Sequence, residues 1–205
     1  MQSRSSIGGD AILPPDISVP VCRNCDLQLL LFLQFDVDAA WELPIEAGSH
    51  LAIFMCPNCN EIPCFSYHGG GELPDRYWET TEGHFFAVLG KPTPESVVRT
   101  QPPLLMKRKV RFEPVENAAV TAEITAGGEP QWIQDPEEFV CCCGEKMAFI
   151  AQVAENFGFR KQPDAPSQPN SFSADEYCLF LGNEIYIFAC PKQCHPRAVW
   201  ITVQG

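Results

Sequence analysis

Positive charge is scarce in this chain of 205 residues. Lysine and arginine together number 14, against 26 aspartates and glutamates, which gives a formal net charge of −12. Binding to a phosphate backbone requires basic surface, so nucleic acid is not expected as a partner. An acidic surface is better suited to a basic protein, and a basic protein partner is therefore predicted.

Long apolar runs are also missing. No stretch approaches the roughly 18 consecutive apolar residues of a membrane-spanning helix. Residues Met1–Asp10 lack the apolar run of a secretory signal. We therefore expect a cytoplasmic protein that does not enter a membrane. Disulfides are rare in the reducing cytoplasm, so the eleven cysteines are candidate metal ligands.

Catalytic signatures are lacking too. The segment His68-Gly69-Gly70-Gly71 is similar to the oxyanion loop of esterases, but no Gly-x-Ser-x-Gly elbow supplies a nucleophile. His50 and His84 each open an apolar stretch without a partner motif, which favours structural or exposed roles. We expect that the protein is not an enzyme.

The composition favours strands over helices. Nineteen prolines and fourteen glycines disfavour long helices. Apolar runs of strand length predict an α+β fold that is mostly β. Helices are expected only at Asp36–Trp41 and Asp135–Phe139, and Gly182-Asn183 is expected to form a hairpin turn. The expected strands are Leu27–Phe35, His50–Met55, Phe85–Leu89, Val110–Val115, Lys146–Val153, Tyr177–Leu181, Ile185–Ala189 and Ala198–Val203.

The two halves of the chain resemble each other. Leu-Ala-Ile-Phe-Met-Cys-Pro at 51–57 matches Ile-Tyr-Ile-Phe-Ala-Cys-Pro at 185–191, and a double glycine opens each half. Gln34 follows Cys25 by nine residues, just as Gln152 follows Cys143. The pattern predicts an internal duplication of a β-rich unit. Residues 1–90 and 104–205 form the repeats, and a proline-rich connection at 91–103 joins them into one compact pseudo-symmetric domain.

The two glutamines at equivalent places have a predicted role of their own. Gln34 and Gln152 are polar residues inside apolar runs. Buried amides must be hydrogen-bonded, so we interpret both as residues that specify the fold.

The first half carries a zinc-ribbon-like cysteine pattern. Cys22-x-x-Cys25 precedes one expected strand, and Cys56-Pro-Asn-Cys59 follows another. Zinc prefers four tetrahedral ligands, and two thiolates on one tight turn supply half of that shell. Two such turns brought together by antiparallel strands complete it. The spacing therefore predicts zinc at these four cysteines.

The second half repeats the pattern less regularly. Its later pair, Cys190 and Cys194, is one residue wider, and His195 follows as an alternative ligand. Earlier in this half, Val140 aligns with Cys22, while three consecutive cysteines occupy the turn. A shift of one residue would let Cys141 and Cys143 bind a second zinc and leave Cys142 outside. The alternative is a degenerate repeat whose cysteines are small core residues.

Redox chemistry is the rival interpretation of the cysteines. Cys56-Pro-Asn-Cys59 is similar to the active site of a thiol oxidoreductase, in which the reactive thiolate lies at a helix N-terminus. Pro63 and Pro196 follow the two later cysteine pairs closely and disfavour such a helix. Cys64 and Cys178 have no partner pattern, and both are expected to be buried structural thiols.

Several motifs in a fixed order resemble a known family. They are Ile7-Gly8-Gly9, the segment Gly-Gly-Glu-Pro-Gln-Trp-Ile-Gln at 127–134, and Cys143-Gly144 followed by Met147 and Gln152. This order resembles the bacterial YwqG-like family of unknown function. The Ile-Phe-x-Cys-Pro motif that closes each half is similar to the related eukaryotic programmed-cell-death-protein-two family. The resemblance covers roughly residues 7–60 and 126–205.

The resemblance implies a duplicated β-rich domain without a known catalytic set. Eukaryotic relatives are linked to ribosome assembly as chaperones of a basic ribosomal protein, and some bacterial relatives to immunity against toxins. Many YwqG-like members lack the cysteines, so zinc is predicted from the spacing in this chain alone. Together these observations predict a non-enzymatic zinc-binding interaction module that acts as a chaperone or inhibitor of a basic protein. The alternative is a thiol oxidoreductase that uses Cys56 and Cys59.

Overall fold

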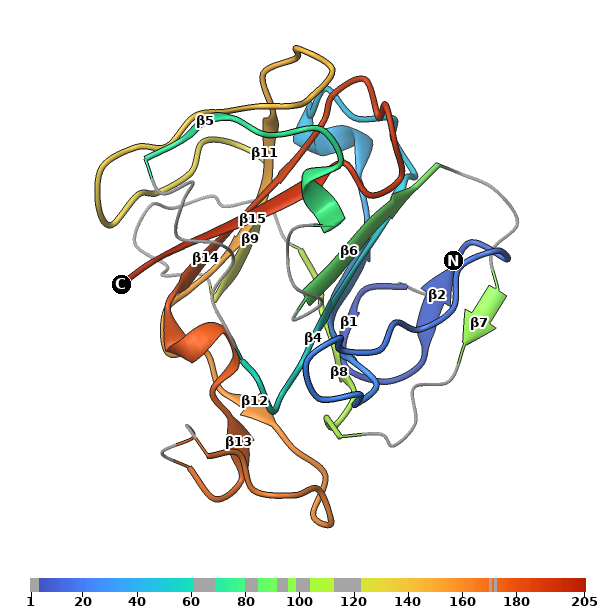
Figure 1. The fold of residues 1–205 in the computed structure, drawn as a ribbon, viewed down its shortest axis with the longest axis vertical. Coiled ribbons are helices and arrows are strands. Elements are labelled where there is room, and N and C mark those ends of the chain that lie inside the picture. The colour runs from blue at the N-terminus through green and yellow to red at the C-terminus, as the bar shows by residue number, and fades with distance from the viewer. Residues whose placement is uncertain are drawn as a thin grey trace.

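The computed structural model describes residues 4–60, 69–79, 85–91, 96–98, 104–112, 123–169, 171 and 173–205. Strands dominate this part of the chain (Figure 1). Its helices are the short 3-10 segments η1 (Ala39–Trp41), η3 (Tyr77–Glu79) and η4 (Leu179–Gly182). The prediction of a mostly β fold is confirmed, although the helical part is smaller than an α+β class implies. None of these helices has the length and apolar character needed to cross a membrane.

Two larger sheets form the body of the molecule. One has the strand order β6-β4-β3-β1-β8, and the other has the order β15-β14-β11-β9. They lie side by side in Figure 1, with β6 next to β15. Their strands are β1 (Ser6–Ile7), β3 (Leu30–Asp36), β4 (His50–Met55), β6 (Phe85–Gly90), β8 (Arg108–Lys109), β9 (Ile124–Ala126), β11 (Ala148–Val153), β14 (Glu184–Ala189) and β15 (Val199–Gln204).

In the described part of the chain, three strand pairs lie outside these sheets. Strand β2 (Ala11–Leu13) pairs with β7 (Ser96–Val98), and β12 (Phe159–Arg160) pairs with β13 (Glu176–Tyr177), both antiparallel. Strand β5 (Gly71–Glu72) runs parallel to β10 (Phe139–Val140) and so joins the first half to the second. Strand β8 likewise belongs to the second half by sequence but pairs with β1. The two halves are therefore interlocked.

The central strand pairs of the two sheets have the same register. In the first sheet, Leu30 pairs with Met55, and the register shifts between Leu31 and Leu33. In the second, Ala148 pairs with Ala189, and the register shifts between Phe149 and Ala151. Each central strand thus has one bulged residue at the same position. This correspondence supports the predicted duplication, but a common origin of the two halves remains a prediction.

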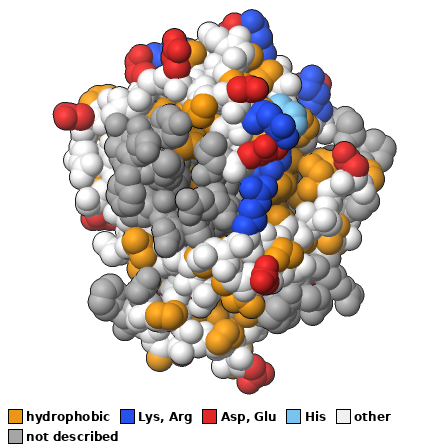
Figure 2. All heavy atoms as spheres, in the orientation of Figure 1, with side chains coloured by type: hydrophobic (Ala, Val, Ile, Leu, Met, Phe, Trp, Pro, Cys, Tyr) orange, Lys and Arg blue, Asp and Glu red, His pale blue; other side chains and the backbone are white. Residues whose placement is uncertain are grey.

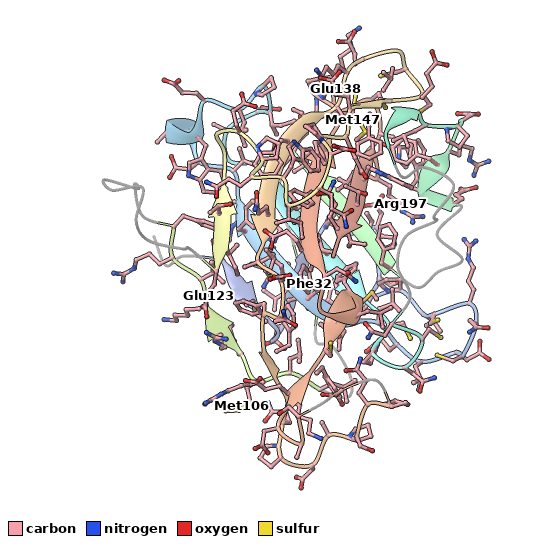
Figure 3. The ribbon with its side chains drawn as sticks, turned by 90° about the vertical axis from the view of Figure 1, so that its left-hand side faces the viewer. Phe32, Met106, Glu123, Glu138, Met147 and Arg197 are labelled. Carbon is pink, nitrogen blue, oxygen red and sulfur yellow. The ribbon has the colours of Figure 1, made fainter. Side chains whose placement is uncertain are left out.

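Both faces of the central strands are buried, which explains their continuous apolar runs. On one face, residues of both sheets meet in a shared core, with Phe32 near its centre (Figure 3). On the other face, each sheet has its own smaller cluster. One contains Leu31 and Phe54, and the other contains Phe149 and Phe188. The bulge lets two consecutive residues face the shared core, which directs the glutamine after them toward the outer side.

Gln34 and Gln152 occupy equivalent buried positions. The Oε1 atom of each accepts from the backbone N–H of the third residue after a double glycine, Ile12 at 3.0 Å and Gln131 at 2.9 Å. The residues beside them differ: His50 lies next to Gln34, whereas Glu184 accepts from Gln152. The prediction that both amides are hydrogen-bonded parts of the fold is confirmed, as is a structural role for His50.

Several expectations about secondary structure are wrong. Residues 135–138 form no helix, and Asp36 is still part of β3, so only Ala39–Trp41 is helical near it. Gly182-Asn183 does not turn a hairpin, because β14 pairs with β11 and β15 instead. The strand expected at Tyr177–Leu181 is also wrong, because β13 ends at Tyr177 and the chain then forms η4. Within η4, Phe180 has a left-handed φ of 52° and packs into the shared core. Residues 110–112 are not in a strand.

Several predicted features lie outside the described residues. They include Cys64, His68, His84 and most of the predicted connection at 91–103. Within that connection, Ser96–Val98 forms β7. The boundaries of the two repeats remain a prediction.

A charged network closes the end of β3. The Asp36 carboxylate accepts from Arg4 Nε at 2.9 Å and lies 2.8 Å from Nδ1 of the buried His50. Partial burial alone would raise the pKa of Asp36. The hydrogen bonds and positive charges of His50 and Arg4 outweigh it and lower this pKa below its ordinary value of 3.8.

Replacing Asp36 with asparagine should lower the free energy of unfolding at neutral pH by about 1–2 kcal/mol, because hydrogen bonds to a carboxylate are lost. Since the pKa is lower in the folded state, this contribution is complete above about pH 4 and disappears as the pH falls through the folded value. Urea unfolding at neutral and acid pH measures the difference. The exposed Asp164→Asn serves as the control. A deficit in Asp36→Asn that persists in acid would contradict this account.

Candidate metal centres

The first candidate centre is formed by two turns at the end of the β3–β4 pair. In the turn at 22–25, the Asp26 N–H donates to the Cys22 carbonyl at 2.9 Å, and Asp26 adopts a φ of 58°. In the turn at 56–59, the Asn60 N–H donates to the Cys56 carbonyl at 3.0 Å, with a φ of 45° at Asn60. The left-handed residue after each pair lets the chain reverse at the end of each turn.

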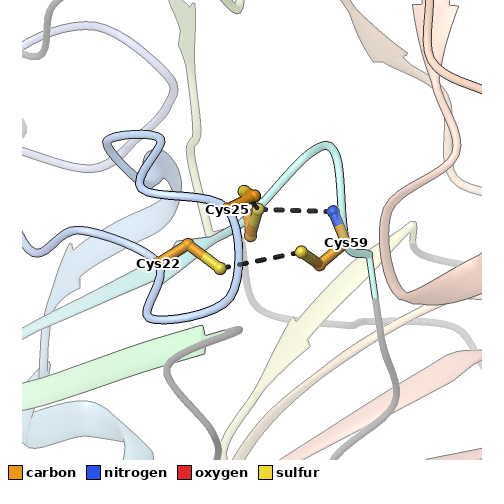
Figure 4. Close-up of side chains that lie close together, drawn as sticks. Cys22, Cys25 and Cys59 are labelled. Atoms are coloured by element: carbon orange, nitrogen blue, oxygen red, sulfur yellow. Dashed lines mark hydrogen bonds between the residues drawn. The ribbon is translucent and has the colours of Figure 1, made fainter.

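These turns bring four sulfur atoms together. Cys22 Sγ lies 3.7 Å from Cys59 Sγ (Figure 4), and Cys25 Sγ lies 3.5 Å from Cys56 Sγ. All four sulfurs lie within 4.8 Å of one another. A tetrahedral zinc about 2.3 Å from each ligand would separate its sulfurs by about 3.8 Å. The first cluster therefore has the dimensions of a four-thiolate metal site.

The second candidate centre has the same plan. Cys141 Sγ lies 3.6 Å from Cys194 Sγ, and Cys143 Sγ lies 3.5 Å from Cys190 Sγ. These four sulfurs also lie within 4.8 Å of one another. Cys143 is five residues before Ala148, the first residue of β11, as Cys25 is five residues before Leu30, the first of β3. Cys190 and Cys56 directly follow β14 and β4.

In the second cluster, a shorter first turn is compensated by a longer second turn. Its first turn is one residue shorter than the turn at 22–25, with a φ of 87° at Gly144 and a hydrogen bond from the Gly144 N–H to the Cys141 carbonyl. Its second turn is one residue longer, and the φ of 44° occurs at Gln193, before Cys194. A salt bridge from Lys192 to Glu145 joins the two turns. The same four-sulfur arrangement thus arises from different spacings.

All eight predicted ligands therefore lie in two clusters of four. Cys142 is exposed, and although its sulfur is 4.0 Å from Cys141 Sγ, it is not among the four. His195 is not among them either, and its ring stacks on Trp78 at 4.3 Å. Cys178 is half-buried, and burial raises the pKa of its thiol.

Hydrogen bonds make one thiol in each cluster more acidic. Burial would raise the pKa of Cys25, but the Leu27 N–H and the neighbouring thiols donate to its sulfur and lower it. At the equivalent position, the Glu145 N–H lowers the pKa of Cys143. Burial raises the pKa of Cys56, Cys59, Cys141, Cys190 and Cys194. Without a cation most of these thiols keep their protons, so metal binding must release protons.

Two contacts at the clusters were not indicated by any sequence pattern. The Asn24 side chain donates to Cys59 Sγ at 3.2 Å across the first cluster. The buried Tyr77 hydroxyl lies 3.9 Å from Cys141 Sγ beside the second. Cysteine spacing alone could not identify either residue, because each reaches its sulfur from another segment or turn.

Each cluster is also docked on the opposite half of the chain. Asn60, after the turn at 56–59, donates to the Cys178 carbonyl, and Gln168 donates to the Pro57 carbonyl at 2.8 Å. In return, the Pro196 carbonyl accepts from the Leu89 N–H at 2.8 Å, just past the turn at 190–194. The two clusters therefore lie where the halves are fastened together.

The fold and its sites define a mostly β protein with two closed four-cysteine clusters that can each hold a metal ion. Comparisons with models of protein families, with curated proteins and with solved structures found no match.

The ligand assignment predicts different outcomes for neighbouring cysteines. Cys143→Ser should remove about one metal ion per chain, because a hydroxyl replaces a thiolate in a closed shell. Cys142→Ser should retain the full metal content, since Cys142 is outside the cluster. Elemental analysis of both purified variants measures this. If the two variants lose metal equally, Cys142 is a ligand and the assignment is wrong.

Proposed function

We propose that this chain is a non-catalytic protein-interaction module whose binding surfaces are stabilised by zinc. The observation that carries the proposal is the pair of closed four-cysteine clusters. Structural zinc sites use four protein ligands, whereas catalytic zinc keeps one position for water or substrate. Here cysteines complete each shell, so a bound ion would hold the turns in place and would not contact a substrate.

Zinc is the ion that these ligands favour. A tetrahedral set of four thiolates is typical of structural zinc and also of iron. Zinc does not change its oxidation state, which suits an ion with a purely structural role. Each cluster lies at the ends of strands, where such an ion would hold the turns together. The colour and metal content of the purified protein distinguish the two ions, since a zinc–thiolate site is colourless.

A thiol oxidoreductase that uses Cys56 and Cys59 is the competing function. An attacking thiol must be accessible and acidic. Cys56 is fully buried, and burial raises its pKa. Cys59, the more accessible of the two, also has a raised pKa. These properties favour a metal ligand over a nucleophile.

A basic protein is the proposed partner. The net charge of −12 favours it, and so does the resemblance of the sequence motifs to the YwqG-like and programmed-cell-death-protein-two families. The role that follows is that of a chaperone or inhibitor which shields a basic protein from other contacts. Affinity purification from native lysate tests this role, and reproducible absence of a basic partner counts against it.

Protein purified without added metal should contain two zinc ions per chain, one for each cluster. Elemental analysis combined with thiol titration measures this, because metal-bound thiolates react slowly until a chelator is added. Iron in place of zinc would change the identity of the ion only. A metal content near zero with freely reactive thiols would refute the proposed metal sites.

Removal of the metal should loosen the cluster turns while the fold remains. The chain is long enough to bury a core without metal, unlike a small zinc finger. Hydrogen exchange with and without chelator should therefore become faster near residues 20–26, 55–60, 140–144 and 189–195. Leu30–Leu33 and Phe149–Ala151 should stay protected, because they lie within paired strands. Global loss of protection would show that metal nucleates the fold, and unchanged exchange would show that no structural metal was present.

A further inference from the structure

Three arginines and a histidine lie between the two cysteine clusters. The histidine contributes its ring and not a charge, because burial and the nearby positive charges of Arg197 and Arg76 lower its pKa. Arg23 belongs to the turn at 22–25, whereas His195 and Arg197 follow the turn at 190–194. Arg76 directly precedes η3, which lies between them in the structure. Figure 2 shows Lys and Arg side chains gathered next to a histidine on this face of the molecule. We call Arg23, Arg76, His195, Arg197 and Trp78 the cationic patch.

Direct contacts with η3 hold the patch together. Arg23 Nη1 donates to the Glu79 carbonyl at 3.5 Å, and Arg197 Nη2 donates to the Trp78 carbonyl at 2.7 Å. The His195 ring stacks on Trp78, with an interplanar angle of 1°. Since His195 is exposed, this pair presents a flat aromatic surface between the arginines.

The charges within the patch are not balanced. Glu79 is the carboxylate that acts on Arg197 and on His195 among the described residues, and it also pairs with Arg76. The Arg197 guanidinium lies over the Phe86 ring at 4.4 Å, and its buried Nε has no hydrogen-bond partner in the described part of the chain. Burial and the nearby positive charge of Arg23 lower the pKa of Arg197. An anion bound at the exposed Arg23 and Arg76 would relieve this repulsion and offer acceptors to their guanidinium groups.

Exposed apolar side chains lie next to the turn that carries Arg23. Val21 and Leu27, at the base of the turn at 22–25, are 51% and 48% exposed. Aromatic and arginine side chains with apolar neighbours are enriched where proteins bind each other. Guanidinium forks fit carboxylates in bidentate geometry. The composition of this surface therefore suits a peptide that carries both acidic and apolar side chains.

We propose that the cationic patch binds an acidic segment of a partner protein. A short segment fits better than a nucleic acid, because a long polyanion would extend from the patch onto a chain with a net charge of −12. This contact is distinct from the basic partner proposed above and does not require that partner. It does require ordered cysteine turns, so it should be tested on protein whose metal content is known.

The test uses a fluorescent peptide of alternating glutamate and leucine, with anisotropy as the readout. The native protein should bind it, with an affinity that falls as salt is added. Arg23→Gln and Arg76→Gln should each weaken binding several-fold, and the double variant by roughly tenfold or more. Both arginines are exposed, and their contacts with Glu79 are long or solvent-exposed and therefore weak, so the variants should keep a near-native melting temperature and the native zinc content.

Arg160→Gln is the matched control. Arg160 is also exposed, but its carbonyl accepts from the Met106 N–H, and Met106 lies far from Arg197 in Figure 3. Its substitution should leave the affinity unchanged. The proposal is overturned if the native protein does not bind the peptide, if all variants bind alike, or if a lysine-leucine peptide binds equally well. It is also overturned if an oligouridylate of equal length binds more tightly, which would indicate a nucleic-acid surface.

Discussion

The register between the two central strands of each sheet positions both cysteine clusters. Leu30 opposite Met55 leaves Cys25 and Cys56 at the same end of the first sheet, and the equivalent pair has the same effect in the second. The bulge preserves this register while it turns the following glutamine away from the shared core. A one-residue slip would separate the sulfurs and bury the amide in apolar surroundings. Metal geometry and core packing therefore select the same register.

Much of this arrangement follows from the order of residues in the sequence. Nine residues separate Cys25 from Gln34, and nine separate Cys143 from Gln152. The segment from the last cysteine of the turn through the bulge to the glutamine therefore has the same length in both halves. Four strands were located to within one residue or less at each end, because they are buried on both faces and largely apolar. The prediction of a hairpin at Gly182-Asn183 was wrong, because glycine is favoured in turns whether or not the flanking segments pair as strands. Strand partners are long-range, and local sequence does not specify them.

The second cluster shows where local pattern ceases to be informative. A shorter first turn would misplace Cys141 if the facing turn had normal length. The facing turn is longer by one residue, and the four sulfurs meet again. Sequence spacing describes each turn separately, whereas the site depends on the sum of both. The contacts from Asn24 and Tyr77 could not be predicted for a similar reason, since they cross between turns or segments.

The reciprocal docking gives the clusters a role beyond their own turns. Each one fixes a segment that hydrogen-bonds to the opposite half of the chain. An ion in one cluster would therefore stabilise the contact between the halves as well as its four ligands. The cationic patch depends on the same contact, because Arg23 and Arg197 reach η3 from turns of different clusters. Net charge averages over the whole surface, whereas recognition depends on which side chains folding brings together. An acidic chain can thus present a cationic surface, provided that both cysteine turns hold their arginines beside Trp78.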